Sequence, residues 1–145
     1  MTREENCGGE ATSTVKNYRD SGKYALNKAL DGDSSTYWCS VWNNADAKVW
    51  WKYKFATAVH VGRIKLSMTY YSSNLGRITI LAGNDCNEKV GTLLVNDTSK
   101  SFAREEEYDI DGKLFVCYMI QFHLKKADYV AINEAEFFQG RSFQP

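Results

Sequence analysis

The sequence predicts an all-β protein, an antiparallel jelly-roll β-sandwich of about eight strands. Short runs of alternating apolar and polar residues follow one another along most of the chain, and turn residues such as Asp111-Gly112 separate them. Helix signals are scarce, and the single proline is Pro145. With 145 residues and no internal repeat or long linker, residues 1–145 are expected to form one domain.

The first strands are predicted where the alternation is clearest. In residues 49–55 the apolar side chains share one face, whereas Lys52 and Lys54 share the other. Residues 63–68 repeat this pattern with three apolar side chains pointing inward. The best helix signal, residues 23–30, would make about two turns before these strands begin.

The later strands are predicted from apolar runs that end at turn residues. The longest is 114–124, and the weaker ones are 89–95 and 101–110. Residues 77–82 form a further strand, and 129–138 close the set.

The composition argues against several classes of partner, and a local charged patch remains compatible with it. Lysine plus arginine number 18 and aspartate plus glutamate number 18, so the chain lacks the basic excess that nucleic acids or a mainly electrostatic membrane anchor would require. No apolar run is long enough to span a bilayer, and residues 1–6 are too polar for a signal peptide. Aromatic residues make up 14% of the chain, which suits both strands and flat contacts with ligands.

The four cysteines, Cys7, Cys39, Cys86 and Cys117, lack the spacing of a metal site and allow three disulfide pairings. Cys117 lies in an apolar strand, where a buried thiol and a disulfide are equally compatible with the pattern. The sequon at 96–98 is compatible with secretion.

Catalytic patterns are weak. His60 and His123 lie beside or within strands, without a nucleophile motif or a cysteine partner. The run 105–107 contains three glutamates, but a solvated strand edge explains them better than glycoside hydrolysis does. No phosphate-binding glycine pattern is present. We therefore expect a binding module and not an enzyme.

The most informative segment is 29–38. It packs two carboxylates, a glycine and three hydroxyls into residues 31–36 and ends on Tyr37-Trp38. A loop this rich in oxygen either wraps a hard cation or turns the chain sharply. It is not an EF-hand, because glycine is missing at its sixth position and Trp42 stands where the closing glutamate belongs.

Taken in order, these segments resemble the discoidin, or coagulation factor 5/8 type C, family of galactose-binding-like jelly rolls. The superfamily includes carbohydrate-binding modules and fucose-binding lectins. The resemblance rests on the Ala-x-Asp-Gly loop and following Trp in 27–38, the Trp and alternating strands of 51–67, the strand and loop of 74–85, and the closing strand 132–137. It covers nearly the whole chain.

The resemblance implies a structural calcium between the first loop and the closing strand. Its ligands would be the carboxylates of Asp31 and Glu134, the main-chain carbonyls of Lys28, Asp33 and Asn133, and an oxygen of Thr36. About six oxygens with two carboxylates suit Ca²⁺ well. Without an ion, Asp31 would cap backbone amides in a tight turn.

The resemblance also places ligands at loops on one end of the sandwich. The loops here would be 40–46, 69–74 and 125–129, with 18–23 beside them. The side chains expected to stack on a sugar or to hydrogen-bond its hydroxyls are Trp42, Tyr70, Tyr71, Tyr129, Asn43, Asn44, Asp46, Asn74, Arg77 and Lys126. As alternatives, the aromatic residues would be core or lone surface residues, the asparagines would only turn the chain, and at least one of Tyr70 and Tyr71 would point inward.

Two departures leave the ligand open. Cys39, not histidine, follows Trp38, and residues 70–73 contain no arginine, whereas galactose-binding relatives often use both. We therefore expect a glycan ligand, with a galactose-type sugar favoured. The alternative is a discoidin-type adhesion domain that contacts a protein or membrane phospholipid. Either role implies an extracellular or cell-surface location, and weak binding by one site would need tandem domains or a homo-oligomer.

Overall fold

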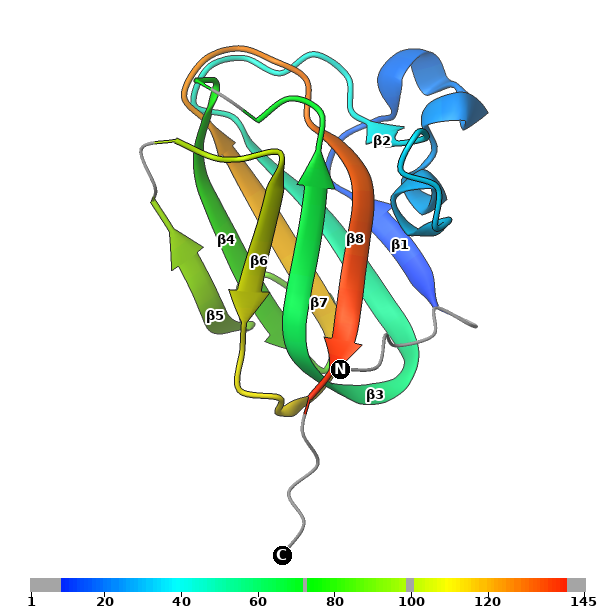
Figure 1. Cartoon of the computed structure of the whole chain (residues 1–145), viewed down its shortest axis with the longest axis vertical. Helices are drawn as coiled ribbons and strands as arrows, with labels where there is room; N and C mark the ends of the chain where they lie inside the picture. The colour runs from blue at the N-terminus through cyan, green and yellow to red at the C-terminus, as the bar shows by residue number, and fades with distance from the viewer. Residues whose placement is uncertain (1–8, 72, 99–100, 141–145) are drawn as a thin grey trace, which may run out of the picture.

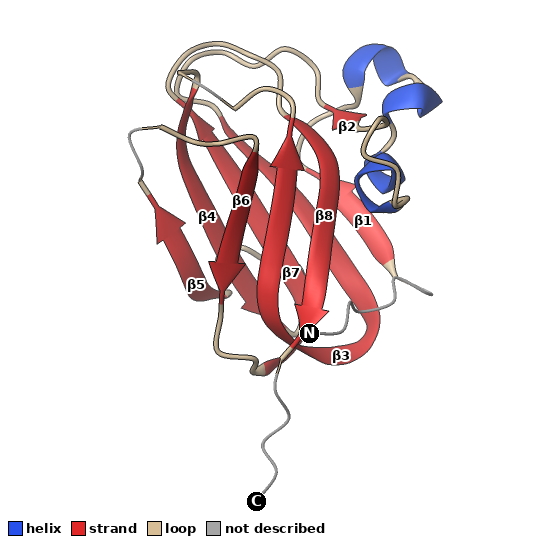
Figure 2. Cartoon of the chain, viewed as in Figure 1, coloured by secondary structure: helices blue, strands red, loops and turns tan. Residues whose placement is uncertain are grey.

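The computed structural model describes residues 9–71, 73–98 and 101–140, which form eight strands and three short 3-10 helices (Figure 2). The strands are β1 (Glu10–Ser13), β2 (Trp38–Cys39), β3 (Lys48–Met68), β4 (Leu75–Gly83), β5 (Thr92–Asp97), β6 (Glu105–Asp109), β7 (Leu114–Leu124) and β8 (Ala131–Gln139). The helices are η1 (Tyr18–Asp20), η2 (Gly22–Tyr24) and η3 (Leu26–Leu30). All strand pairs are antiparallel, which confirms the predicted sandwich.

Strand β3 belongs to both sheets of the sandwich (Figure 1). Its first part pairs with β1 as far as Lys54 and with β7 as far as His60, and its last part, from Val61, pairs with β6 and β8. The first sheet has the order β1-β3-β7-β4-β5, and the second has the order β6-β3-β8-β2. The sequence predicted two separate strands here, 49–55 and 63–68. They are continuous because no glycine or proline stands between Phe55 and Val61 and the β-branched residues there favour extended backbone.

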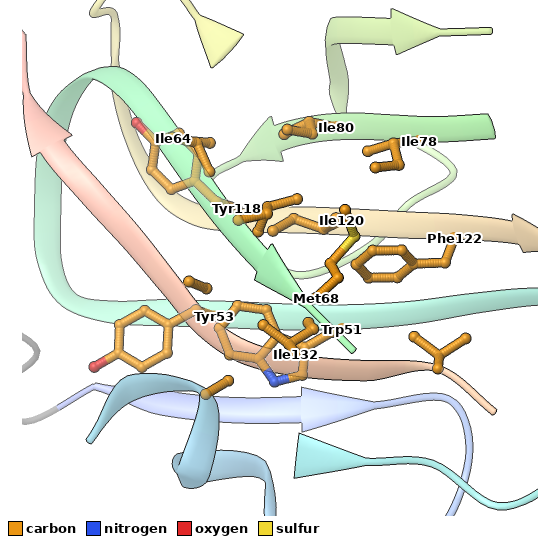
Figure 3. Close-up of a cluster of buried hydrophobic side chains, with 14 of the residues drawn as sticks. Trp51, Tyr53, Ile64, Met68, Ile78, Ile80, Tyr118, Ile120, Phe122 and Ile132 are labelled. Carbon is orange, nitrogen blue, oxygen red and sulfur yellow. The ribbon is translucent and has the colours of Figure 1, made fainter. Parts of the chain in front are cut away.

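The core fills the space between the sheets (Figure 3), and on β3 its side chains come from the predicted inward faces. The first sheet contributes Trp51, Tyr53 and Phe122, and the second contributes Ile64 and Ile132. The Tyr53 ring lies 4.9 Å from the Phe55 ring and 6.0 Å from the Phe137 ring, measured between centroids. Side chains that alternate with period two thus bury one face of each sheet, as the pattern predicts.

The outer face of the first sheet is partly covered by the loop that follows β4. A disulfide joins Cys86 in this loop to Cys117 on β7. The Lys52 ammonium donates a hydrogen bond to the Cys86 carbonyl over 2.9 Å and pairs with the Glu88 carboxylate, which leaves Lys52 only 8% exposed. Among the described cysteines only Cys39 is free, and it is buried; Cys7 lies outside the described residues.

Several predicted boundaries differ from the structure. In place of one helix over 23–30, η2 and η3 are separated by Ala25 in an extended conformation (φ −65°, ψ 158°). The weaker strands begin later than predicted, at Thr92 and Glu105, because residues before them form turns. Strands β1 and β2 were missed, since four and two residues are too few to show alternation. In the described part, no helix is long and apolar enough to cross a membrane.

The loops predicted to gather do so at one end of the sandwich (Figure 1). Residues 40–47 lead into β3, residues 69–74 connect β3 to β4, and residues 125–130 connect β7 to β8. At the other end, Gly112 adopts a left-handed turn (φ 73°) and its carbonyl lies 2.7 Å from Nδ1 of His60. His60 therefore has a structural contact away from the gathered loops.

We predict that replacing both Cys86 and Cys117 with serine lowers the free energy of unfolding by about 3–4 kcal/mol, because the disulfide closes a loop with a sequence separation of 31 residues. Denaturant unfolding with and without reductant measures this change. Reductant should destabilise the native protein to the same extent and leave the double variant unchanged. Equal stability of the two proteins without reductant would refute the prediction.

Candidate functional site

The buried carboxylate of Asp128 ties the gathered loops together. Asp128 is 8% exposed, and its Oδ2 accepts a hydrogen bond from the side-chain amide of Asn74. Its Oδ1 accepts a hydrogen bond from the Tyr129 backbone N–H over 2.7 Å. The backbones of Asp128 and Asn43 exchange two hydrogen bonds of 3.0 Å. One residue thus links all three loops.

A second buried contact reinforces this link. The Ser40 hydroxyl oxygen accepts hydrogen bonds from the Asn43 side-chain amide over 3.0 Å and from the Val130 N–H over 2.9 Å. The Asn43 amide also donates to the Val41 carbonyl over 2.9 Å. Two predicted sugar-binding residues, Asn43 and Asn74, therefore use their amide nitrogens to close the loops.

Tyrosines line a pocket of about 210 Å³ beside these loops. Its walls are Tyr18, Tyr24, Tyr37, Cys39, Tyr70 and Tyr129. We call it the tyrosine pocket. The rings pack on one another in a chain: the Tyr129 centroid lies 5.3 Å from that of Tyr18 and 5.5 Å from that of Tyr70. The first contact is edge-to-face and the second is tilted, and such ring contacts restrict the positions of the phenols.

The described lining of the tyrosine pocket consists of phenol groups and one thiol, without an acidic or basic side chain. Burial raises the pKa of Tyr37 and of Tyr70, so both phenols stay protonated and can donate hydrogen bonds. Burial, with a smaller contribution from the negative charge of Asp128, raises the pKa of the Cys39 thiol to about 11. The pocket thus offers neutral hydroxyl groups and a neutral thiol.

Trp42 lies at the margin of the tyrosine pocket. Its ring centroid is 5.1 Å from that of Tyr129 at an interplanar angle of 78°, and Trp42 is still 55% exposed. Of the four aromatic residues predicted to bind ligand, the structure brings Trp42, Tyr70 and Tyr129 together. Tyr71 instead packs against the core, so one member of the Tyr70–Tyr71 pair points inward as expected.

The remaining predicted residues are divided between other places. Asn44 and Lys126 are exposed on the loops. Asp46 and Arg77 line a second hollow, which also includes His123 and does not share lining residues with the tyrosine pocket.

Sequence reasoning missed three pocket residues, Tyr18, Tyr24 and Tyr37. The segment 18–23 was expected near the loops, but nothing in the sequence distinguishes its tyrosine from a core aromatic. Tyr24 and Tyr37 belong to segments interpreted as a helix and as part of an oxygen-rich loop. They line the pocket because η1 and η2 fold back beside β2 (Figure 2).

The oxygen-rich loop folds around Asp31. The Thr36 hydroxyl oxygen lies 2.5 Å from Asp31 Oδ2 and 3.0 Å from the Asp33 carbonyl, while the Asp33 N–H donates to Asp31 Oδ1 over 3.0 Å. Gly32 takes a left-handed conformation (φ 76°) that lets the chain turn. A carboxylate, a hydroxyl and a carbonyl therefore converge.

The closing strand meets this loop at two residues. The Asn133 amide donates to the Ser34 carbonyl over 3.0 Å. The register of β8 shifts at this point: Glu134 pairs with Ser67 and Ile132 with Met68, so Asn133 is the extra residue of a bulge.

The buried side chain of Glu134, which is 5% exposed, interacts with the Asp31 carboxyl group. Burial alone would raise the pKa of the Asp31 carboxyl, but hydrogen bonds from Thr36 and the Asp33 N–H, together with the Glu134 contact, hold it below its usual value. Within the described residues, no three His, Cys, Asp or Glu side chains gather as metal ligands. The carboxylates of Asp31 and Glu134, together with nearby hydroxyl and carbonyl oxygens, fit a hard cation such as Ca²⁺ better than Zn²⁺.

We predict that Asp128→Ala lowers the free energy of unfolding by about 1–3 kcal/mol, because the Asn74 amide and the Tyr129 N–H both lose their acceptor in a buried site. Thermal unfolding measures this loss. The matched control is Asp109→Ala, which removes an exposed ion pair with Arg63 and should cost less than about 1 kcal/mol. Equal effects of the two substitutions would contradict the role assigned to Asp128.

Comparisons with known proteins agree on the fold. The family 32 carbohydrate-binding module of Clostridium perfringens NanJ, solved with galactose, has 18% identity and a TM-score of 0.74 over 95% of this chain and 98% of that one. The C. perfringens module CpGH89CBM32-5, solved with GalNAc-β-1,3-galactose, has 10% identity and a TM-score of 0.76 over 94% of this chain and 99% of that one. The corresponding module of AlyQ, solved with 4,5-unsaturated mannuronic acid, has 16% identity and a TM-score of 0.72 over 97% of this chain and 100% of that one.

A search of the curated proteins finds no match to the chain. The family model of the F5/8 type C domain, however, matches residues 9–133, which is most of the sequence. The chain therefore belongs to the F5/8 type C domain family.

Proposed function

We propose that this domain is a non-catalytic glycan-binding module that holds a sugar in the tyrosine pocket and against Trp42. The observation that carries the proposal is a pocket of neutral phenols beside a half-exposed tryptophan. Aromatic faces pack on the C–H groups of a sugar ring, and phenol hydroxyls both donate to and accept from sugar hydroxyls. Structurally similar modules have been solved with galactose and related sugars, which supports the same class of ligand.

The uncharged lining favours a neutral sugar residue, and we propose a galactose-type sugar first. The buried Asp128 carboxylate near Cys39 and Tyr70 makes an anion unfavourable in this pocket. A pocket of about 210 Å³ holds little more than one sugar ring, so binding by a single domain is weak. Tandem domains of a larger protein or a homo-oligomer would supply avidity. The Cys86–Cys117 disulfide supports an extracellular or cell-surface location.

We also propose a structural calcium between the oxygen-rich loop and β8. The carboxylates of Asp31 and Glu134, an oxygen of Thr36 and the main-chain carbonyls of Lys28, Asp33 and Asn133 would hold it. The support is the convergence of the Asp31 carboxylate, the Thr36 hydroxyl and the Asp33 carbonyl, beside the interaction of Asp31 with the buried Glu134 carboxyl group. The bulge at Asn133 supports the assignment of its carbonyl, because a bulged residue is released from the regular strand ladder. When bound, the ion would stiffen the loop that leads to Tyr37.

We predict that Trp42→Ala weakens glycan binding at least tenfold, because the aromatic platform beside the pocket is lost. A glycan array on multimerised protein, followed by titration of the best ligand, measures this effect. Leu114→Ala is the matched control: it truncates another exposed apolar residue, at the opposite end of the sandwich, and should change nothing.

Selective binding that is unchanged in Trp42→Ala would contradict this site. An array without signal from correctly folded protein would contradict the glycan proposal. It would favour the alternative adhesion role, in which the exposed Trp42 contacts a protein or a membrane.

We predict that calcium at about a hundred times its dissociation constant stabilises the domain by about 2.7 kcal/mol. Thermal unfolding in calcium and in EDTA measures the difference. Asp31→Asn and Glu134→Gln should each reduce the response, whereas Asp109→Asn, on an exposed side chain of β6, should leave it intact. Identical melting temperatures in calcium and EDTA would disprove the calcium site and leave the glycan proposal standing.

A further inference from the structure

We propose a second binding site, separate from the tyrosine pocket, that binds a carboxylate or sulfate group of an acidic glycan. It is a hollow of about 190 Å³, which we call the basic hollow. Its lining consists of Asp46, Gly76, Arg77, Thr98, His123, Leu124 and Lys125. The saccharide nature of this ligand rests on the proposed function, whereas the anion site follows from the charges described below.

Basic residues form a row across three strands at the edge of this hollow. Lys48 on β3 and Arg77 on β4 are both register partners of His123 on β7. Their side chains point away from the core, since the alternating neighbours of His123, such as Phe122 and Leu124, are buried. Lys125, two residues after His123, adds a further positive charge to the lining.

This arrangement leaves positive charge uncompensated. Neither the Arg77 guanidinium nor the Lys125 ammonium makes a hydrogen bond or ion pair with another described residue. Asp46 is the one acidic residue of the described lining, and its exposed carboxylate lies 3.9 Å from His123 Nε2. Like charges on neighbouring strands repel one another, so an anion placed between Arg77 and Lys125 would relieve that repulsion.

The backbone around the basic hollow is firmly held. The Asp46 N–H donates to the Leu124 carbonyl and the Leu124 N–H donates to the Ala47 carbonyl, both over 3.0 Å. These bonds keep Asp46 in a left-handed conformation (φ 66°). At Gly76, a Cβ atom would lie 3.2 Å from Cγ of Lys125, so the missing side chain lets the Lys125 stem pack over β4. The shape of the basic hollow is therefore fixed by backbone hydrogen bonds and by packing between the loops and strands.

The residue types suit an oxyanion. A guanidinium binds carboxylate or sulfate oxygens through two parallel hydrogen bonds, and an ammonium adds a point charge. The Thr98 hydroxyl is a further donor in the lining. The hollow is smaller than sites that enclose whole ligands, so it suits an anionic group with part of its sugar ring.

The basic hollow and the tyrosine pocket flank the same two loops. Lys125 lines the first and Tyr129 the second, and four residues of chain span at most about 15 Å between their Cα atoms. On the other loop, Trp42 at the margin of the tyrosine pocket and Asp46 in the basic hollow are also four residues apart. An acidic glycan can therefore place a neutral residue in the tyrosine pocket and an anionic neighbour in the basic hollow.

The test is an NMR titration of amide signals with galactose, galactose 6-sulfate and inorganic sulfate. We expect galactose 6-sulfate to shift the signals of Arg77, Leu124 and Lys125, and galactose to leave them in place. Affinity at these signals should fall about tenfold in Arg77→Gln and also in Lys125→Gln, since each removes a charge-assisted contact. The matched control is Lys54→Gln, which removes an exposed lysine further along the same sheet.

The variants replace exposed side chains, and an unchanged melting temperature will verify their folding. Absence of shifts at the three signals, or shifts that persist in both variants, would overturn the basic hollow. Inorganic sulfate binding as tightly as galactose 6-sulfate would overturn the saccharide assignment and identify a site for free anions. Trp42→Ala separates the two proposals, because it should abolish binding in the tyrosine pocket and leave the sulfate-induced shifts unchanged.

Discussion

The bend of β3 is the constraint on which the rest of the structure depends. This strand of 21 residues runs down one sheet, turns at the far end of the sandwich and returns in the other sheet (Figure 1). Because one unbroken strand serves both sheets, its two ends come out at the same end of the molecule. The loops before and after β3 therefore meet, and the connection from β7 to β8 joins them there.

Convergence of loops alone would not make a binding site, because unpaired loop backbone remains mobile. Here the buried Asp128 carboxylate and the Ser40 hydroxyl satisfy donors from all three loops. Buried polar networks of this kind hold their groups in one arrangement only when every member is satisfied. The aromatic rings of Tyr129, Tyr18 and Trp42 rest on that network, so the tyrosine pocket is formed before any ligand arrives.

Much of this could be predicted from the sequence, because period-two alternation depends only on which face a residue occupies. It identified the inward faces of both parts of β3, whereas the gathering of the loops at one end was implied by the family resemblance. It could not reveal the continuity of β3, since residues 56–58 are not buried and resemble a loop. Nor could it assign Asn43 and Asn74, because an asparagine in a loop looks the same whether its amide meets solvent or a buried partner. Nor could it show that Lys52 is covered, because the cover comes from the disulfide-linked loop, which is distant in sequence.

The tyrosine pocket and the basic hollow, at the end of the sandwich where the loops gather, differ in charge. This difference would affect which sugars each of them selects. Histidine and arginine are absent from the described lining of the tyrosine pocket. In the proposed glycan-binding role, discrimination among neutral sugars would therefore come from the positions of the phenol hydroxyls. Ring packing fixes those positions, and the neighbouring Asp128 charge disfavours acidic sugars. The basic hollow, which lies beside the row of Lys48, His123 and Arg77, would instead favour acidic sugars. A polymer that alternates neutral and acidic residues would satisfy both hollows, whereas a uniformly acidic or uniformly neutral one would satisfy only one of them.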